Sequence, residues 1–189
     1  MKTLSSLKLR PLELEDIEDY REMTHPSRAY HKYNGPYYKH DNEEEHEEKI
    51  RVLRSKLESG EKNVLGNKEI IADATKNEII GLVNWYWKSE ETNWLEVGIV
   101  IFNENYWGCG VGYKALSMWI DKMFERKEAL VRIGLTTWSG NVRMMKLAEK
   151  MGLKKEAEYR KARIVEGVYY DSVSYGVLKE EWERLKRKL

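Results

Sequence analysis

The chain has 189 residues, a length that suits one compact domain. Hydrophobic residues make up 41% of it and charged residues 34%, enough for an apolar core beneath a solvated surface. The 33 basic and 32 acidic side chains leave a net charge of +1, which argues against a nucleic-acid-binding surface. No stretch approaches the ~20 apolar residues that cross a bilayer, and the first six residues lack a signal-peptide segment. We therefore expect a single cytoplasmic domain over residues 1–189, without a nucleic-acid or membrane partner.

The residues that most often bind metals are few and unevenly placed. A single cysteine, Cys109, excludes an internal disulfide and any multi-cysteine zinc site. All four histidines lie between His25 and His46, so a histidine-based triad would have to come from a segment that looks irregular. We expect no metal site.

The first third of the chain predicts one strand and two helices. Residues 7–12 read as a short strand stopped near Pro11, and apolar residues then recur at helical spacing over 14–23. Turn residues and aromatics over 24–41 predict a loop. Asp41 or Asn42 can cap a second helix with Ile50, Leu53 and Leu57 on its inner face. The acids at 43–48 are most simply its solvated first turns.

The remaining residues alternate between strand and helix patterns. Strand-like segments at 70–75, 79–88 and 94–101, separated by short turns, favour an antiparallel meander. A helix with an apolar stripe over 115–124 follows, then a strand at 131–138, a helix ending at Gly152, a hairpin of 153–165 with 168–178, and a charged helix at 179–188. The order predicts an α+β fold with a mixed sheet of about six to seven strands and one central strand–helix–strand unit.

Three glycines, Gly108, Gly110 and Gly112, lie between the strand at 94–101 and the next helix. Glycine lets the backbone approach an anion, and a helix N-terminus supplies N–H groups, so the cluster suits a phosphate. The spacing is wrong for a P-loop. Residues 110–115 match G-x-G-x-x-A, but the next strand ends without the carboxylate that a dinucleotide site needs. A plain tight turn is the structural alternative.

Residues 107–112, WGCGVG, resemble the coenzyme A pyrophosphate loop of the GNAT superfamily of acetyl-CoA-dependent N-acetyltransferases, with Trp107 in place of the usual Gln or Arg. Three further blocks, at 9–12, at 137–141 with 149–153, and at 170–182, are similar to the same family in the same order. The similarity points to the branch resembling ribosomal-protein N-terminal (alanine/serine) acetyltransferases. It implies a GNAT-like sheet in which the two central parallel strands splay apart.

The resemblance also implies which residues bind acetyl-CoA. Backbone groups of the central strand would bond pantetheine, loop amides would bind the pyrophosphate, and an asparagine would touch the pantetheine arm. The corresponding residues are Val100, Ile101, Phe102, Trp107, Gly108, Cys109, Gly110, Val111, Gly112, Tyr113, Lys114 and Asn141. Asn141 is equally suited to cap the following helix, and Lys114 to be an ordinary exposed lysine.

The catalytic residues are harder to assign. Glu96, on the central strand, matches the glutamate that acts as base in related enzymes, although an acid there can also be a surface residue. The family's acid, a tyrosine, aligns with Ala148. Tyr106, Tyr169, Tyr170 or water could substitute, or the thiolate could leave without a dedicated donor, and the sequence does not choose among these.

The resemblance implies an enzyme that moves the acetyl group of acetyl-CoA to a primary amine by direct attack in a ternary complex. The acceptor could be a protein or peptide N-terminus, or a small amine such as a polyamine, an aminoglycoside or a metabolite. A non-catalytic coenzyme A sensor is the alternative. A monomer and a homodimer are both compatible with the sequence.

Overall fold

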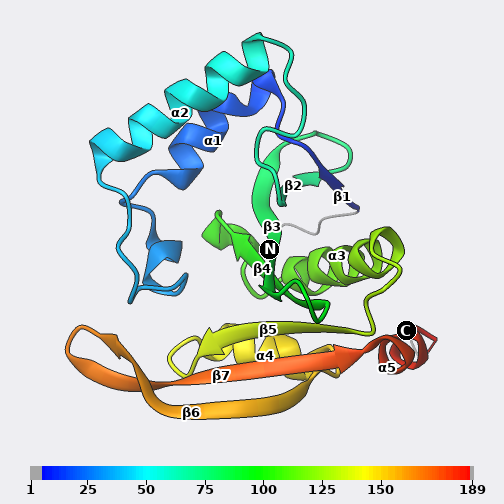
Figure 1. Cartoon of the computed structure of the whole chain (residues 1–189). Helices are drawn as coiled ribbons and strands as arrows, with labels where there is room; N and C mark the ends of the chain where they lie inside the picture. Colours follow the sequence, from blue (N-terminus) through cyan, green and yellow to red (C-terminus); the bar gives the residue numbers. More distant parts are fainter. Residues whose placement is uncertain (1–5, 188–189) are drawn as a thin grey trace. The chain divides into compact units, whose positions relative to one another are not determined.

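The computed structural model describes residues 6–187, in which seven strands form one mixed sheet in the order β1-β2-β3-β4-β5-β7-β6, flanked by helices (Figure 1). This architecture confirms the predicted α+β fold. The chain groups into two compact units, one containing the chain up to Asn84 with Ile99–Ala115 and the other Trp85–Gly98 with Leu116 onward. Most of the N-terminal segment considered for a signal peptide, and residue 188 of the expected last helix, lie outside the described residues.

The first unit contains the antiparallel start of the sheet, whose second and third strands are the first pair of the meander predicted over 70–75, 79–88 and 94–101. β1 (Leu7–Arg10) pairs antiparallel with β2 (Lys68–Asp73), which pairs antiparallel with the first half of β3 (Ile79–Ser89). The strand expected at 7–12 ends at Arg10, before Pro11, because proline cannot donate to the next ladder position. The strand expected at 70–75 is displaced two residues toward the N-terminus.

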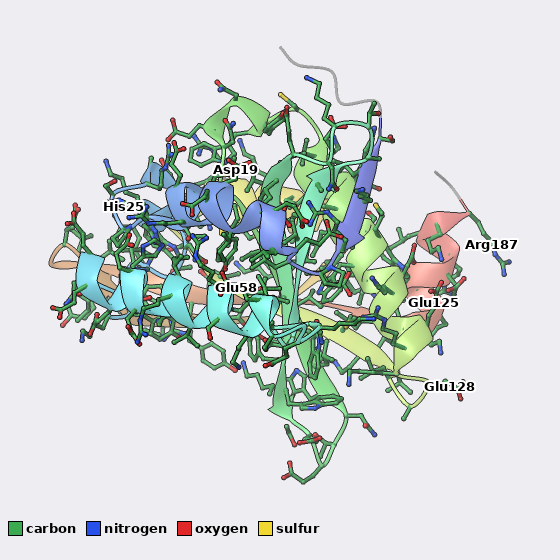
Figure 2. All side chains as sticks on the ribbon, turned by 90° about the horizontal axis from the view of Figure 1, so that it is seen from above. Asp19, His25, Glu58, Glu125, Glu128 and Arg187 are labelled. Atoms are coloured by element: carbon green, nitrogen blue, oxygen red, sulfur yellow. The ribbon has the colours of Figure 1, made fainter. Side chains whose placement is uncertain are left out.

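Two helices, α1 (Ile17–Thr24) and α2 (Glu43–Glu58), lie side by side and run antiparallel (Figures 1 and 2). A short 3-10 turn, Leu14–Asp16, precedes α1, and another, Ala29–Lys32, lies in the segment expected to be a loop. Asn42 is the cap of α2, since its side chain accepts the Glu45 N–H at 2.8 Å. Ile50 is buried, and Leu53 and Leu57 pack against the same apolar cluster, as predicted.

The second unit contains the parallel pairing and the C-terminal hairpin. Its elements are the tip of β3 with the start of β4 (Trp94–Ile101), most of α3 (Val111–Arg126), β5 (Arg132–Trp138), α4 (Val142–Lys150), β6 (Lys154–Val165), β7 (Val168–Leu178) and α5 (Lys179–Lys186). β4 pairs parallel with β5 at Leu95↔Ile133 and Glu96↔Gly134, whereas β5 pairs antiparallel with β7 along its whole length. This confirms the predicted central β-α-β unit.

α5 is fastened to the last turns of α3, near Glu125, as Figure 2 shows. The Trp182 indole donates to Asp121 at 2.7 Å, and Lys186 pairs with the same carboxylate at 2.9 Å. The apolar stripe expected on α3 is buried throughout, from Ala115 to Phe124. None of the described helices is long and apolar enough to cross a membrane.

β3 and β4 approach closely at Gly81 in the first unit. A Cβ at Gly81 would lie 2.1 Å from the Val100 carbonyl oxygen, and the Phe102 N–H donates to the Ile80 carbonyl at 3.0 Å. Glycine inside a strand often marks such an approach of backbone to backbone. Gly81 therefore fixes where β4 runs as it enters the glycine-rich loop.

Gly81→Ala is expected to lower the free energy of unfolding by about 1–3 kcal/mol, because the methyl group must displace backbone. Gly134→Ala is the matched control: it is also a strand glycine, but its Cβ would meet its nearest neighbour at 3.3 Å, so a smaller loss is expected. Chemical denaturation measures both. Equal losses in the two variants would contradict the assigned role of Gly81.

Candidate functional site: a glycine loop, a buried carboxylate and a histidine-lined cavity

The glycine-rich loop belongs to the first unit and connects β4 to α3. After Phe102, Asn103 caps a short 3-10 turn (Glu104–Tyr106) by accepting the Asn105 N–H at 3.0 Å. Gly108 (φ +75°) and Gly110 (φ +80°) then adopt left-handed conformations, and a Cβ on either would meet nothing within 4 Å. The two glycines are therefore required by backbone conformation and not by local crowding.

α3 begins at Val111, so the helix N-terminus lies directly after the glycines. The first-turn N–H groups of a helix have no carbonyl partner within the helix and favour an anion. Lys114 is an exception among the residues predicted to bind pyrophosphate through their amides, because its N–H donates to the Gly110 carbonyl at 3.1 Å. Val111 is buried, and the Cys109 sulfur lies 3.6 Å from the Asn105 and Trp107 carbonyl oxygens.

Trp107 ties this loop to β4. Its indole Nε1 donates to the Ile101 carbonyl at 2.9 Å, and the ring packs edge-on against Tyr33 with centroids 5.8 Å apart. Its side chain also packs against the apolar core of the unit. The structure thus brings together Val100, Ile101, Phe102, Trp107 and the glycines in one unit, and Trp107 takes a structural contact that the sequence did not reveal.

Glu96 and Asn141, the other two predicted site residues, belong to the second unit. Asn141 caps α4 by accepting the Met144 N–H at 3.1 Å, as the alternative interpretation expected. Glu96 is only 2% exposed, so the surface interpretation of this residue is wrong. Its carboxylate accepts hydrogen bonds from Tyr86 and Lys88 of β3 and from Thr136 of β5.

Alternation along β3 explains these contacts. Tyr86 and Lys88 face Glu96, while Trp85 and Trp87 face the other way and hold the Lys127 ammonium at 4.1 and 4.9 Å from their ring centroids. Gly134 of β5 lies opposite Glu96, where its missing side chain leaves room for the carboxylate. Tyr86 and Lys88 were not singled out as partners because nothing in the sequence shows which strands become neighbours.

The structure adds a feature that the sequence analysis missed, a cavity of about 640 Å³ in the first unit. Its lining includes aromatic and apolar side chains of the helices and strands together with two histidines: Tyr20, Tyr30, His31, His46, Val100 and Phe102. His46 packs edge-on against His25, and His31 against His40. The confinement of all four histidines to residues 25–46 was the available signal.

The protonation of His46 follows from its neighbours. The Thr24 hydroxyl has one proton and donates it to the Tyr20 carbonyl at 2.7 Å, so it accepts from His46 Nε2 at 2.9 Å. Nε2 therefore carries the ring proton, and Nδ1 is the unprotonated nitrogen. Burial lowers the pKa of His46, against the opposing charge of Glu47.

His31 is also held neutral. Burial, followed by the nearby His40, lowers the pKa of His31, and the backbone carbonyls of Thr24 and His25 offset only part of this effect. Among the described residues, no group of three or more His, Cys, Asp or Glu is placed to hold a metal ion.

Comparisons with known proteins identify the family of the chain. The family model of the acetyltransferase (GNAT) domain matches residues 6–154, so the chain belongs to the GNAT family. The SPbeta prophage-derived N-acetyltransferase YokL of Bacillus subtilis (strain 168) is 28% identical over 113 residues, which is 60% of this chain and 63% of that protein.

Solved structures share the fold. A GNAT-family acetyltransferase from Bacillus anthracis superposes with a TM-score of 0.70 at 19% identity, over 93% of this chain and 96% of that one. Spermidine N-acetyltransferase from Vibrio cholerae, in complex with CoA and spermine, superposes with a TM-score of 0.71 at 20% identity, over 95% and 99% of the two chains.

Because the folded-state pKa of His31 and of His46 is lowered, their contribution to stability is complete above about pH 6.5, the unfolded value. It is lost as the pH falls toward the folded-state value, since the unfolded chain then binds more protons. We expect the melting temperature to fall between pH 7 and pH 5. His31→Gln and His46→Gln should each make this fall shallower. A fall as steep in both variants as in the wild type would contradict the assignment.

Proposed function

We propose that this chain is an acetyl-CoA-dependent N-acetyltransferase, acting as one domain over residues 1–189. The observation that carries the proposal is the loop from Gly108 to the start of α3, whose left-handed glycines stand at a helix N-terminus and would have nothing within 4 Å of an added Cβ. An anionic pyrophosphate can approach such a backbone closely. Membership of the GNAT family supplies the class of cofactor. The cytoplasmic location and the oligomeric state stay predictions from the sequence.

The cofactor lies along β4 and the loop in this proposal. Loop amides before Lys114 bind the pyrophosphate, and backbone groups of Val100–Phe102 meet the pantetheine arm. The short parallel pairing of β4 with β5 supports this role, because strands that pair only at their start leave backbone groups further along for another partner. Trp107 is assigned to holding the loop on β4, since its N–H is already bonded to Ile101.

The acceptor in this proposal is a small primary amine. A cavity of about 640 Å³, lined by aromatic, apolar and charged side chains, is within the size range of small-molecule sites. The Vibrio cholerae enzyme, which was crystallised with spermine, adds support for an amine of this size. A peptide N-terminus, which the sequence resemblance favours, is the second candidate acceptor.

In the transfer reaction the amine attacks the thioester carbonyl while both substrates are bound, and positioning supplies much of the rate. Glu96 serves as the general base. The position of the family's tyrosine acid is filled by Ala148, which is fully buried in the apolar core. No acid acts from that position in this proposal.

A panel of amines tests the activity. Purified protein is incubated with acetyl-CoA and spermidine, an aminoglycoside or a peptide with a free N-terminus, and thiol release is measured. Acetyl-CoA at ~100 times its dissociation constant should add about 2.7 kcal/mol of stability. Release with an amine, beyond hydrolysis without one, is the expected result. A melting shift without turnover on any amine would favour a coenzyme A sensor. No melting shift with acetyl-CoA would contradict both the acetyltransferase and the sensor.

The glycine loop has a matched test. Gly110→Ala should raise the dissociation constant of acetyl-CoA by about tenfold or more, a loss of about 1.4 kcal/mol, because the methyl group enters the space given to pyrophosphate. Gly60, at φ +83° with nothing within 4 Å of a Cβ, offers the same backbone strain away from the loop. Gly60→Ala should cost similar stability, about 1–2 kcal/mol, and leave the dissociation constant unchanged. Equal affinities in the two variants, measured by calorimetry, would contradict the loop's role.

A further inference from the structure

The carboxylate of Glu96 is enclosed by hydrogen-bond donors. Lys88 Nζ lies 3.2 Å and Thr136 Oγ1 lies 3.0 Å from Oε1, and the Tyr86 hydroxyl donates to Oε2. The side chain is 2% exposed. Oε1 therefore already accepts two hydrogen bonds, whereas Oε2 accepts one, from Tyr86, within a side chain that is almost completely shielded from solvent.

The direction of each hydrogen bond follows from its chemistry. An ionised carboxylate only accepts, so Tyr86, Lys88 and Thr136 all donate to Glu96. Thr136 thereby uses its single proton, and the Ser174 hydroxyl, 2.9 Å away, must donate to it. Of the two hydroxyls that reach Glu96, Thr136 thus receives a proton from β7 and lies inside the sheet, whereas Tyr86 belongs to a residue with 41% of its surface exposed.

We infer that Tyr86 is the group through which Glu96 removes the proton from the acceptor, its hydroxyl receiving the ammonium proton while passing its own to Glu96 Oε2. The inference rests on the proposed acetyl transfer and assigns the contact with the amine to Tyr86, with Glu96 acting behind it. A hydroxyl can accept one proton and release another in the same step, which the ammonium of Lys88 cannot do because it has no lone pair.

The protons balance over the reaction. The acceptor ammonium loses one proton to Tyr86, Tyr86 gives one to Glu96, and the neutral amine forms the C–N bond as the C–S bond breaks. The second proton, lost from nitrogen, ends on the coenzyme A thiolate. Glu96 then returns its proton to solvent through Tyr86, so that the net products are the amide, free coenzyme A and one released proton.

The residues that face Glu96 shape this step. Lys88 stabilises the carboxylate before the transfer, and its charge remains when Glu96 becomes neutral. Lys88 and Thr136 keep Oε1 occupied, which leaves Oε2 as the oxygen that takes the proton. Gly134 places no side chain against the carboxylate, so the geometry depends on these polar contacts.

Tyr86→Phe tests the inference on an amine that the wild type accepts. The turnover number at pH 7 should fall by about 10²–10⁴-fold, the usual size of base catalysis, while the dissociation constant of acetyl-CoA changes little. The loss should shrink as the pH is raised toward 10, because the amine then arrives neutral. Tyr159→Phe removes the same hydroxyl from a tyrosine that is 57% exposed on β6 and should leave turnover and its pH profile unchanged.

Glu96→Gln and the double variant separate a relay from a merely structural contact. Removing either of two groups in one proton path already blocks the path. The double variant Tyr86→Phe with Glu96→Gln should therefore turn over no more slowly than the slower single variant. A loss of turnover in the double variant equal to the product of the two single losses would overturn the relay. So would a near wild-type rate for Tyr86→Phe, or a loss in that variant that stays constant with pH.

Two further outcomes are distinguishable. A loss in Thr136→Val as large as in Tyr86→Phe, with the same pH dependence, would move the path to Thr136 and overturn the assignment. If Tyr86→Phe does not fold, 3-fluorotyrosine at position 86 keeps the hydroxyl and makes it more acidic, and the pH profile of turnover should shift; an unshifted profile would overturn the inference. A wild type that releases no thiol with any amine would instead refute the proposed function itself.

Discussion

A carboxylate buried inside a β-sheet has to be matched by donors, and Glu96 imposes this requirement on every strand around it. Removing one partner of a buried charge typically costs several kcal/mol, because the charge that remains is desolvated and unpaired. Lys88 supplies the opposite charge, and the hydroxyls of Tyr86 and Thr136 take up further lone pairs. Gly134 leaves the space that the carboxylate occupies. The strand order around β4 is therefore tied to one side chain as well as to the backbone ladder.

β4 meets a second constraint beyond Glu96. Gly81 lets the β3 backbone come close to Val100, and the Phe102 N–H also bonds to β3. Between these two residues, the Ile101 carbonyl accepts a hydrogen bond from the Trp107 indole. These contacts act on the stretch that leads into the glycine loop. A tryptophan at the position where the family usually has Gln or Arg thus keeps a polar N–H, but directs it to the protein backbone.

Local signals made much of the fold predictable. The bounds of β4 and the hairpin across Glu166–Gly167 followed from alternation and turn residues, and Asn42 was one of two caps considered. The glycine loop could be found because left-handed backbone selects glycine. The contacts of Glu96 could not, since Thr136 is 40 residues away and the hydroxyl of Tyr86 becomes a partner only through strand pairing. The cavity and the neutral state of His46 likewise depend on segments that meet only after folding.

Ala148 stands where related enzymes have a tyrosine acid, and the chemistry of the proposed reaction explains why this acid is not needed. A primary alkyl ammonium resembling lysine has a pKa near 10.4, so at pH 7 only about one molecule in 2,500 is ready to attack. A thiol resembling cysteine has a pKa near 8.5, and its thiolate leaves readily without a proton donor. The larger barrier therefore lies in deprotonating the amine and not in protonating the thiol. In this chain, three donors on β3 and β5 hold the Glu96 carboxylate, whereas a core alanine, Ala148, fills the position of the acid. The polar groups therefore lie where the amine is deprotonated, which is the step with the larger barrier.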